Sequence, residues 1–380
     1  MRIAIYAPYL DVYGGGEKYI GKIAETLSEK HDVEFVVLTK PNMEELQSRL
    51  NIDLTRVGIR HLRVPSVLNK TPNLKSFAAY PLISRLTKSY DIFINQEHFS
   101  AIPTFAKRSI LICEVPLKMS SSPFRLVTNL HRYLLLDPKL RSYDKIVTNS
   151  YYSQKWIKKY YNKTVDVLYP PIDTVAFVAQ ATSKQHVILS VGRFFIGGHS
   201  KKQKEMIRFF KELYHGNETL RDWEYHLIGQ AKFDAESQEY LKTCQHEAKG
   251  YPIFFHTNAP FDQVKQLYKQ AKIFWHATGL DEDENKHPER LEHFGIATGE
   301  AMSAGCVPIV INKGGQREIV LGGIEGFLWD TPEQLKECTL ILVKNDNLRQ
   351  QMSLLSIKKS RDFDLESFKK RLKQILALEE

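Results

Sequence analysis

Short apolar runs alternate with amphipathic stretches along the whole chain. Five runs in the first half have the length and composition of buried strands: Arg2–Ala7, Val33–Leu38, Asp91–Asn95, Ser109–Cys113 and Lys145–Asn149. Between the first two lies Glu17–Lys30, whose apolar residues recur at helical spacing. Strands that alternate with helices are typical of parallel sheets with helices on both faces.

The second half repeats this alternation. Its predicted strands are His186–Val191, Tyr225–Ile228, Ile253–His256, Lys272–His276 and Val307–Ile311, and its predicted helices are Lys202–Tyr214, Phe233–Lys249, Phe261–Lys269 and Phe294–Ser303. Pro170 and Pro171 together break both kinds of element, so we place a domain boundary at residue 172. We expect an α/β chain of two doubly wound domains, 1–172 and 173–362, with a last helix at about 363–380 that packs back on the first domain.

Composition narrows the class of protein. The formal net charge of +9 indicates an anionic partner, whether a phosphorylated substrate, an acidic membrane surface or a nucleic acid. No apolar run is long enough to cross a membrane, and the N-terminal run is too short for a signal peptide. The 4 cysteines are scattered, without the spacing of a zinc site. These features predict a cytoplasmic protein with reduced thiols.

Glycines follow the first predicted strand. Gly14, Gly15 and Gly16 stand before a helix, where backbone amides can approach an anion closely. The dinucleotide-binding motif requires a glycine where this chain has Tyr19. The phosphate-loop motif requires a serine or threonine, whose hydroxyl would hold magnesium, where this chain has Ile23. A ligand-binding helix start and a tight turn without a ligand both remain open.

A basic loop follows the first strand of the second half. Gly192-Arg193 ends that strand, and Lys201 and Lys202 begin a helix, where cations oppose the helix dipole. A fold avoids that arrangement unless the charges serve a ligand. Arg193 and Lys201 would therefore hold a diphosphate, and a solvated basic loop is the alternative.

Glu292 and Glu300 are separated by seven residues in Glu-His-Phe-Gly-Ile-Ala-Thr-Gly-Glu. We place Glu292 in a loop and Glu300 inside a helix that begins near Phe294 or Gly295. The amides near Gly295 and Ile296 would then donate to phosphate, and a carboxylate would accept from sugar hydroxyls.

Taken together, these motifs resemble the retaining glycosyltransferases of family 4, which have the GT-B fold of two Rossmann-like domains. The resemblance covers nearly the whole chain, and the Glu292/Glu300 element followed by Ala-Met-Ser-Ala-Gly-Cys-Val-Pro is its most specific part. The Glu-His-Phe-Gly-Ile form is similar to mannosyltransferases that extend lipid-linked glycans. The resemblance implies transfer of a hexose, with mannose from GDP-mannose favoured, to a glycan or polyprenyl-linked acceptor, and no further cofactor.

The resemblance also implies roles for individual residues. Arg193 and Lys201 would neutralise the leaving diphosphate. Lys202 would take the role of Lys201 if the alignment of the motif is shifted by one residue. Glu292 would contact the transferred sugar, and Glu300 would hold the donor ribose. The remaining donor-side positions are Gly15, Gly16, Phe294, Gly295 and Ile296, and Glu318 would support the site from behind.

One departure from the family is visible. Many relatives have a histidine two residues before a proline at the end of a first-domain strand, where this chain has Glu114-Val115-Pro116. A carboxylate cannot make the same donor bond. Either Glu114 has another role, such as orienting the acceptor, or His98 supplies the missing group.

Parts of the sequence are also compatible with other functions. Asp281 and Asp283 match the metal-binding D-x-D of another glycosyltransferase fold, which would make the enzyme metal-dependent. A nucleotide-sugar-binding protein without transfer activity is a second alternative, and a nucleic-acid binder lacks any recognisable module. The basic, amphipathic stretch from Lys118 to Lys163 further suggests peripheral contact with an anionic membrane at its inner face.

Overall fold

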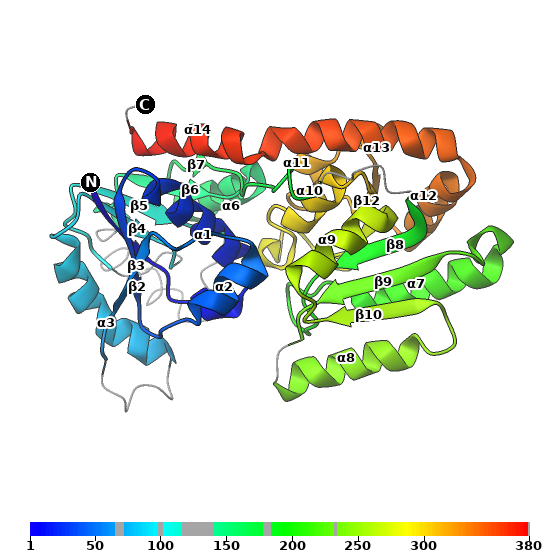
Figure 1. Ribbon diagram of the computed structural model, residues 1–380, viewed down its shortest axis with the longest axis horizontal. Helices are drawn as coiled ribbons and strands as arrows, with labels where there is room; N and C mark the ends of the chain where they lie inside the picture. Colours follow the sequence, from blue (N-terminus) through cyan, green and yellow to red (C-terminus); the bar gives the residue numbers. More distant parts are fainter. Residues whose placement is uncertain (65–71, 98–101, 116–139, 178–183, 232–233, 379–380) are drawn as a thin grey trace. The chain divides into compact units, whose positions relative to one another are not determined.

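The computed structural model describes residues 1–64, 72–97, 102–115, 140–177, 184–231 and 234–378. The chain divides into two compact units (Figure 1). Unit 1 comprises Met1–Leu168 and Arg371–Glu380, and unit 2 comprises Tyr169–Lys370. Unit 2 is therefore inserted into unit 1 along the chain, and each unit has a parallel sheet of its own.

Unit 1 is built on a 7-stranded sheet in the order β3-β2-β1-β4-β5-β6-β7. Every strand pairs parallel with its neighbours. The strands are β1 (Arg2–Tyr6), β2 (Asp32–Val37), β3 (Val57–His61), β4 (Ile92–Asn95), β5 (Arg108–Ile112), β6 (Lys145–Thr148) and β7 (Asp166–Val167). The helices of this unit are α1 (Gly15–Ser28), α2 (Met43–Leu50), α3 (Pro72–Thr87) and α6 (Tyr151–Tyr161), with the end of α14 (Leu365–Leu376).

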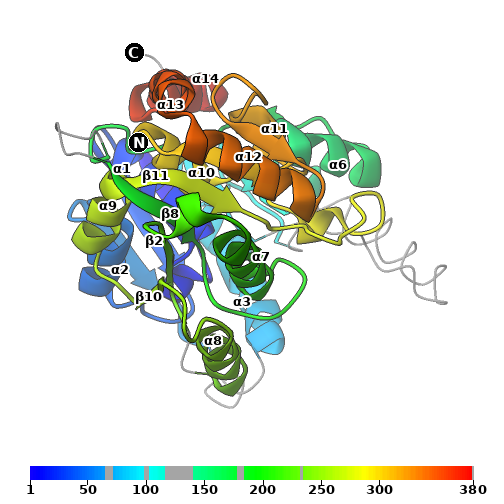
Figure 2. The same cartoon turned by 90° about the vertical axis from the view of Figure 1, so that its right-hand side faces the viewer.

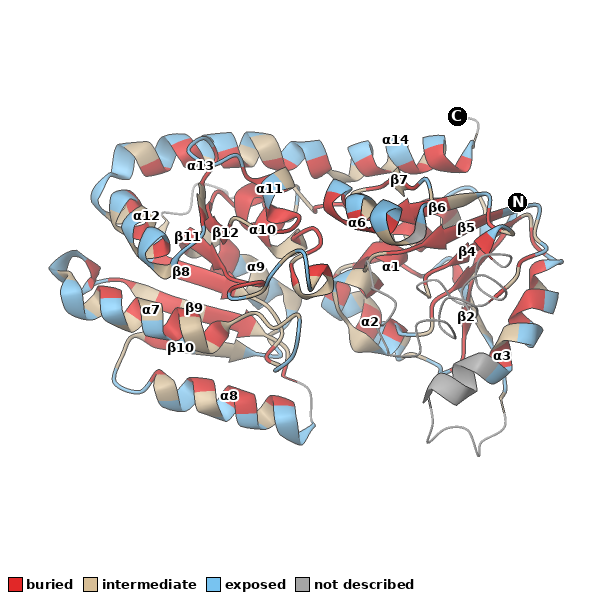
Figure 3. Cartoon of the chain, turned by 180° about the vertical axis from the view of Figure 1, so that it is seen from behind, coloured by how far each residue is buried: buried red, intermediate tan, exposed pale blue. Residues whose placement is uncertain are grey.

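The chain order of this sheet reverses between β1 and β4. In such sheets the loops after the strands on either side of the reversal form a crevice for ligands. The middle strands are buried because helices cover the sheet, as the red central strands of Figure 3 show. In unit 1 the ligand crevice is therefore expected at the loops that follow β1 and β4, next to the loop that follows β5.

Unit 2 is built on a 6-stranded parallel sheet in the order β10-β9-β8-β11-β12-β13. Its strands are β8 (Gln185–Val191), β9 (Glu224–Gly229), β10 (Ile253–Thr257), β11 (Ala271–His276), β12 (Val307–Ile311) and β13 (Phe327–Trp329). Its helices are α7 (Gln203–Gly216), α8 (Ala235–Glu247), α9 (Phe261–Gln270), α10 (Ile296–Ser303), α11 (Gln316–Ile319), α12 (Pro332–Lys344), α13 (Asp346–Ser360) and the start of α14. Here the chain order reverses between β8 and β11.

Two apolar layers hold helices on the two faces of this second sheet (Figure 2). Alternate residues of β11 separate into the layers: Ile273 and Trp275 pack with α7 and α8, and Phe274 packs with α9 and α10. This alternation follows from the two-residue period of a strand. The prediction of doubly wound α/β halves is confirmed.

The division between the units lies four residues before the predicted boundary at residue 172. Tyr169 and Ile172 belong to unit 2 because they pack there. The Tyr169 ring lies 5.2 Å from that of Phe294 and 5.1 Å from that of Phe363, and Ile172 bridges in parallel to Asp364.

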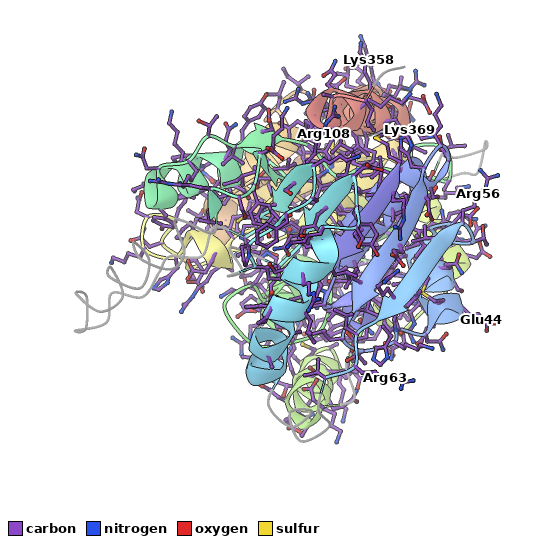
Figure 4. The ribbon with its side chains drawn as sticks, turned by 90° about the vertical axis from the view of Figure 1, so that its left-hand side faces the viewer. Glu44, Arg56, Arg63, Arg108, Lys358 and Lys369 are labelled. Atoms are coloured by element: carbon purple, nitrogen blue, oxygen red, sulfur yellow. The ribbon has the colours of Figure 1, made fainter. Side chains whose placement is uncertain are left out.

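The C-terminal helix connects to unit 1 through its last residues. Arg371 Nε donates to the carbonyl of Val167 at 3.1 Å. Arg108, which begins β5 and is labelled in Figure 4, donates from Nη1 to the carbonyls of Leu376 at 2.8 Å and Ala377 at 3.0 Å. Only the part of α14 from Arg371 onward belongs to unit 1, less than the predicted 363–380.

None of the helices in the described part of the chain has the length and apolar character needed to span a bilayer.

Candidate active site

The candidate site of unit 2 lies at the carboxyl ends of β8, β11 and β12. Gly192 follows β8, His276 ends β11, and the Gly314-Gly315 turn follows β12. β8 and β11 flank the point where the chain order reverses, which is the expected position for a ligand, and β12 is the next strand beside β11.

Lys201 runs directly over Gly192. A Cβ atom on Gly192 would lie 2.5 Å from Cγ of Lys201, so only glycine leaves room for the lysine stem. Lys202 is the N-cap of α7 and has a φ of 56°, an unusual backbone conformation for lysine that turns the chain between Lys201 and the helix. The predicted helix start at Lys202 is therefore correct within one residue.

Lys201 is paired with Glu292. Its Nζ lies 2.6 Å from Oε2 of Glu292, and the two side chains are only 17% and 15% exposed. Burial alone would raise the pKa of Glu292, but the Lys201 ammonium and a hydrogen bond from His276 outweigh it and hold this pKa well below its usual range. The structure thus brings together two residues that the sequence assigned to the diphosphate and to the sugar.

Two histidines near Glu292 were not predicted as site residues. His276 Nε2 lies 3.0 Å from Glu292 Oε2, and His199 Nε2 lies 3.9 Å from Glu292 Oε1. Burial lowers the pKa of both imidazoles, and the Lys201 charge lowers them further. The signal for His276 was available, because it is the last residue of a predicted strand. The sequence could not show that its ring turns toward Glu292.

Arg193 lies beside this cluster. Its charge lowers the pKa of His199, and its guanidinium stacks on Phe195 at 5.4 Å from the ring centroid. Gln203 donates to the carbonyls of Gly192 at 3.1 Å and Arg193 at 3.0 Å, which fixes the backbone of the loop.

The backbone of Glu292 rests on the Gly314-Gly315 turn. Gly315 N donates to the carbonyl of Glu292 at 2.8 Å. A Cβ on Gly314 would lie 2.2 Å from that carbonyl oxygen, and a Cβ on Gly315 would lie 2.2 Å from the carbonyl oxygen of His293. Both glycines are therefore required for the close approach that positions Glu292.

Glu300 lies inside α10, as predicted. Gly295 is the N-cap of this helix, with a φ of 122°, and a Cβ there would lie 2.5 Å from Nε2 of Gln316. Ile296 is the first residue of the helix. Glu300 is buried, and Tyr268 donates its hydroxyl to Glu300 Oε2 at 3.2 Å.

Two predicted site residues have other surroundings. The Phe294 side chain is 2% exposed and packs with Tyr169 and Phe363, so only its backbone can face a ligand. Glu318 Oε2 accepts from the Tyr169 hydroxyl at 2.8 Å and supports that same aromatic cluster. Both residues therefore help to hold the loop before α10 in place.

In unit 1, the predicted glycines form the first turn of α1. The helix begins at Gly15, two residues before its predicted start, and Gly14 N donates to Glu17 Oε2 at 2.7 Å. Glu114 follows β5 and its Oε2 would lie 3.0 Å from a Cβ on Gly16. A carboxyl group thus lies against the start of α1.

Gln96 joins these groups, because its Nε2 donates both to the carbonyl of Gly16 and to Glu114 Oε1, each at 3.0 Å. Burial raises the pKa of Glu114 to about 7, with a smaller contribution from the Glu17 charge. A carboxyl group that titrates near neutrality both donates and accepts hydrogen bonds, which suits a hydroxyl ligand better than a phosphate.

Comparison with known proteins agrees with this geometry. Residues 172–358 match the family described as Glycosyl transferases group 1. The crystal structure of HepE from Anabaena, in complex with UDP and glucose, superimposes with a TM-score of 0.72 at 17% identity over 99% of each chain. The chain has the GT-B fold, and residues 172–358 are similar to group 1 glycosyl transferases.

Curated proteins similar to this chain include two kinds of mannosyltransferase. The GDP-Man:Man(3)GlcNAc(2)-PP-Dol alpha-1,2-mannosyltransferase of Yarrowia lipolytica is 25% identical over 65% of this chain. The human alpha-1,3/1,6-mannosyltransferase ALG2 is 22% identical over 78% of this chain and 75% of its own length. The chain spans 39% of the length of the Yarrowia protein.

The acidic run at residues 281–284 of unit 2 is engaged in ion pairs. Glu282 pairs with Arg290 at 3.3 Å, Asp283 with Lys286 at 3.5 Å and Glu284 with Arg317 at 3.1 Å. Within the described ranges, histidine, cysteine and acidic side chains do not gather into a group of three or more that suits a metal ion.

His98 and residues 118–139 of the basic stretch from Lys118 to Lys163 lie outside the described residues. The predicted roles of His98 and of a membrane-binding surface therefore stay predictions.

Proposed function

We propose that this chain is a retaining, metal-independent glycosyltransferase of family 4, which moves mannose from GDP-mannose to a lipid-linked glycan. The observation that supports this proposal best is the buried Lys201–Glu292 pair at the reversal point of the second sheet. It places one cation and one carboxylate where a ligand with a charged diphosphate and a hydroxyl-bearing sugar would meet both.

The chemistry of the reaction explains why both groups are needed. Cleavage of the bond between sugar and phosphate leaves negative charge on the diphosphate, and fixed cations stabilise that charge. Arg193 and Lys201 take this role, with Lys202 next to them. Glu292 accepts hydrogen bonds from hydroxyls of the mannose, and this fixes the sugar relative to the leaving group.

The remaining groups that bind the sugar donor lie on α10. The amides of Gly295 and Ile296 lie at the start of the helix, where they donate to phosphate. Glu300, one turn further along, accepts from the hydroxyls of the ribose. The leaving phosphate takes the proton of the acceptor hydroxyl, so this mechanism does not assign a protein side chain as general base.

The acceptor side of the proposal rests on unit 1. Glu114, held by Gln96 against Gly16, receives a sugar hydroxyl of the acceptor. The close approach of this carboxyl group leaves the start of α1 poorly suited to a second phosphate. The amphipathic stretch from Lys118 to Lys163 would bring the enzyme to the anionic inner face of a membrane, where a lipid-linked acceptor is found.

A donor screen tests the proposal. The purified protein is incubated with GDP-mannose, GDP-glucose, UDP-glucose and ADP-glucose, with a lipid-linked oligosaccharide as acceptor, and the released nucleotide and anomeric configuration of the product are measured. We expect turnover with GDP-mannose, an α-linked product, and the same rate in EDTA. Loss of activity in EDTA that manganese restores would favour Asp281 and Asp283, and binding without turnover would favour a non-catalytic protein.

A further inference from the structure

His276 shares one oxygen of Glu292 with Lys201. It ends β11, is 5% exposed, and its Nε2 lies 3.0 Å from Glu292 Oε2, the same oxygen that lies 2.6 Å from the Lys201 ammonium. β11 lies between β8 and β12 in the sheet, and His276 pairs with Val310 of β12, so the sheet holds the histidine backbone. Lys201, in contrast, belongs to the loop before α7.

The proton on this imidazole can be placed from its partners. An ionised carboxylate only accepts hydrogen bonds, so the Nε2 of His276 must donate. The Nδ1 of His276 is buried and has no hydrogen-bond partner among the described residues. Burial lowers the pKa of His276, which favours the neutral ring with its single proton on Nε2.

The two donors to Glu292 therefore differ in kind. Lys201 is a cation on a four-carbon stem with several rotatable bonds, and the proposed function requires it to bind the diphosphate of the donor. When it does so, Glu292 loses the one lysine that pairs with it among the described residues. His199 does not replace it, because burial lowers its pKa and its Nε2 lies 3.9 Å from Glu292, beyond hydrogen-bond distance. His276 is the neutral donor that remains on the carboxylate.

We propose that His276 is a positioning residue, whose Nε2–H holds the Glu292 carboxylate in place while Lys201 exchanges this carboxylate for the diphosphate of the sugar donor. The proposal rests on the proposed function, since it assigns Lys201 two successive partners. It explains why a neutral hydrogen-bond donor, rather than a second cation, stands at the end of β11. A cation at this position would attract both the diphosphate and the Glu292 carboxylate.

Kinetics of matched variants test this role. His276→Leu removes the donor at similar volume, and His276→Gln keeps an amide donor near the Nε2 position. We expect His276→Leu to lower kcat by about 10²-fold with little change in the KM for GDP-mannose, because a small misplacement of Glu292 acts mainly on the reacting geometry. His276→Gln should recover at least about tenfold of that loss.

The control is a second histidine–glutamate pair in the same sheet. His226 Nε2 lies 2.9 Å from Glu224 Oε2 at the start of β9, at the opposite end of the strands from the site. His226→Leu should leave kcat unchanged. Equal kcat in the Leu and Gln variants of His276, or a loss that only follows a lower melting temperature, would overturn the proposal.

A spectroscopic measurement separates this inference from the proposed function, since it needs no substrate. In protein labelled with ¹⁵N-histidine, the long-range ¹H–¹⁵N signals of His276, assigned by their loss in His276→Gln, should report a neutral ring protonated at Nε2. A ring protonated at Nδ1, or at both nitrogens at pH 7, would overturn the inference even in an active enzyme. Absence of turnover in wild type with every donor would instead overturn the proposed function.

Discussion

The Lys201 ammonium and the Glu292 carboxylate are separated by 91 residues in sequence and by 2.6 Å in the folded chain. Both side chains are largely buried. The partners of a buried ion pair are interdependent, because the removal of one leaves the other charged and poorly solvated. Each residue of this pair therefore stabilises the other in the free protein, and we expect the two to bind different parts of the donor.

Arg193→Ala and Lys201→Ala should each lower turnover by about 10²-fold, because each removes a cation that stabilises the leaving diphosphate. Arg208→Ala, a change of the exposed α7 arginine that lies 3.9 Å from Glu247, is the control and should keep the wild-type rate. Steady-state release of GDP measures the effect, with the folded fraction checked by circular dichroism. Wild-type rates in both the Arg193 and the Lys201 variants would show that these residues do not stabilise the diphosphate.

Lys201→Met should destabilise the protein by about 3–5 kcal/mol at neutral pH, because it leaves Glu292 buried without its cation. In wild type the depressed pKa of Glu292 contributes stability above about pH 4.5, the usual range of a glutamate, and that contribution is lost as the pH falls through the lower folded-state value. In Lys201→Met burial raises this pKa instead.

The difference in unfolding free energy between wild type and Lys201→Met should therefore be largest near pH 7 and shrink below pH 4.5. Urea unfolding at several pH values measures it, and the double variant Lys201→Met/Glu292→Gln should recover part of the loss. A difference that does not vary with pH would show that Glu292 is not the group concerned.

Gly192→Ala should lower turnover by about tenfold or more while the fold remains, because a Cβ atom 2.5 Å from Cγ of Lys201 forces the lysine stem aside. The matched control is Gly216→Ala at the end of α7, where a Cβ atom meets nothing within 4 Å. Equal rates in the two variants would mean that the path of the Lys201 stem does not matter for the reaction.

Glu114→Gln should flatten the pH dependence of stability between pH 4.5 and 7. The pKa of Glu114 is raised by burial to about 7, so the wild-type protein loses stability as rising pH ionises this buried group. Because Glu114 is partly exposed, we expect the variant to gain only about 1–2 kcal/mol over wild type at pH 8 and nothing at pH 4.

Thermal unfolding across this pH range checks the Glu114 prediction, with Glu44→Gln at an exposed position of α2 as the control (Figure 4). An unchanged slope in Glu114→Gln would place the Glu114 carboxyl in water rather than against Gly16.

The sequence predicted the inner strands of both sheets, helices α1 and α7 to α10 and the order of the site motifs, but not the long helices α12 and α13. It missed β3, β7 and β13, because they are short or lie at the edges of the sheets, where one partner strand is enough and the apolar pattern is weak. It placed Glu300 inside α10 correctly because the glycine before Ile296 marks the start of a helix.

Contacts between distant segments could not be predicted in the same way. The motif order implied that Lys201 and Glu292 serve one ligand, but only the fold shows that they bind each other. Phe294 looked like a ligand residue since it stands between Glu292 and Gly295. Its ring instead packs with Tyr169 and Phe363, which lie far from it in sequence.

The insertion of unit 2 between Leu168 and Arg371 sets the order in which the protein is completed during synthesis. The ribosome releases β1 to β7 first, but the segment that supplies the Leu376 and Ala377 carbonyls to Arg108 emerges only after all of unit 2. Domains generally fold as they emerge, N-terminal first. Unit 1 therefore begins first but is completed last, after all of unit 2 has been made.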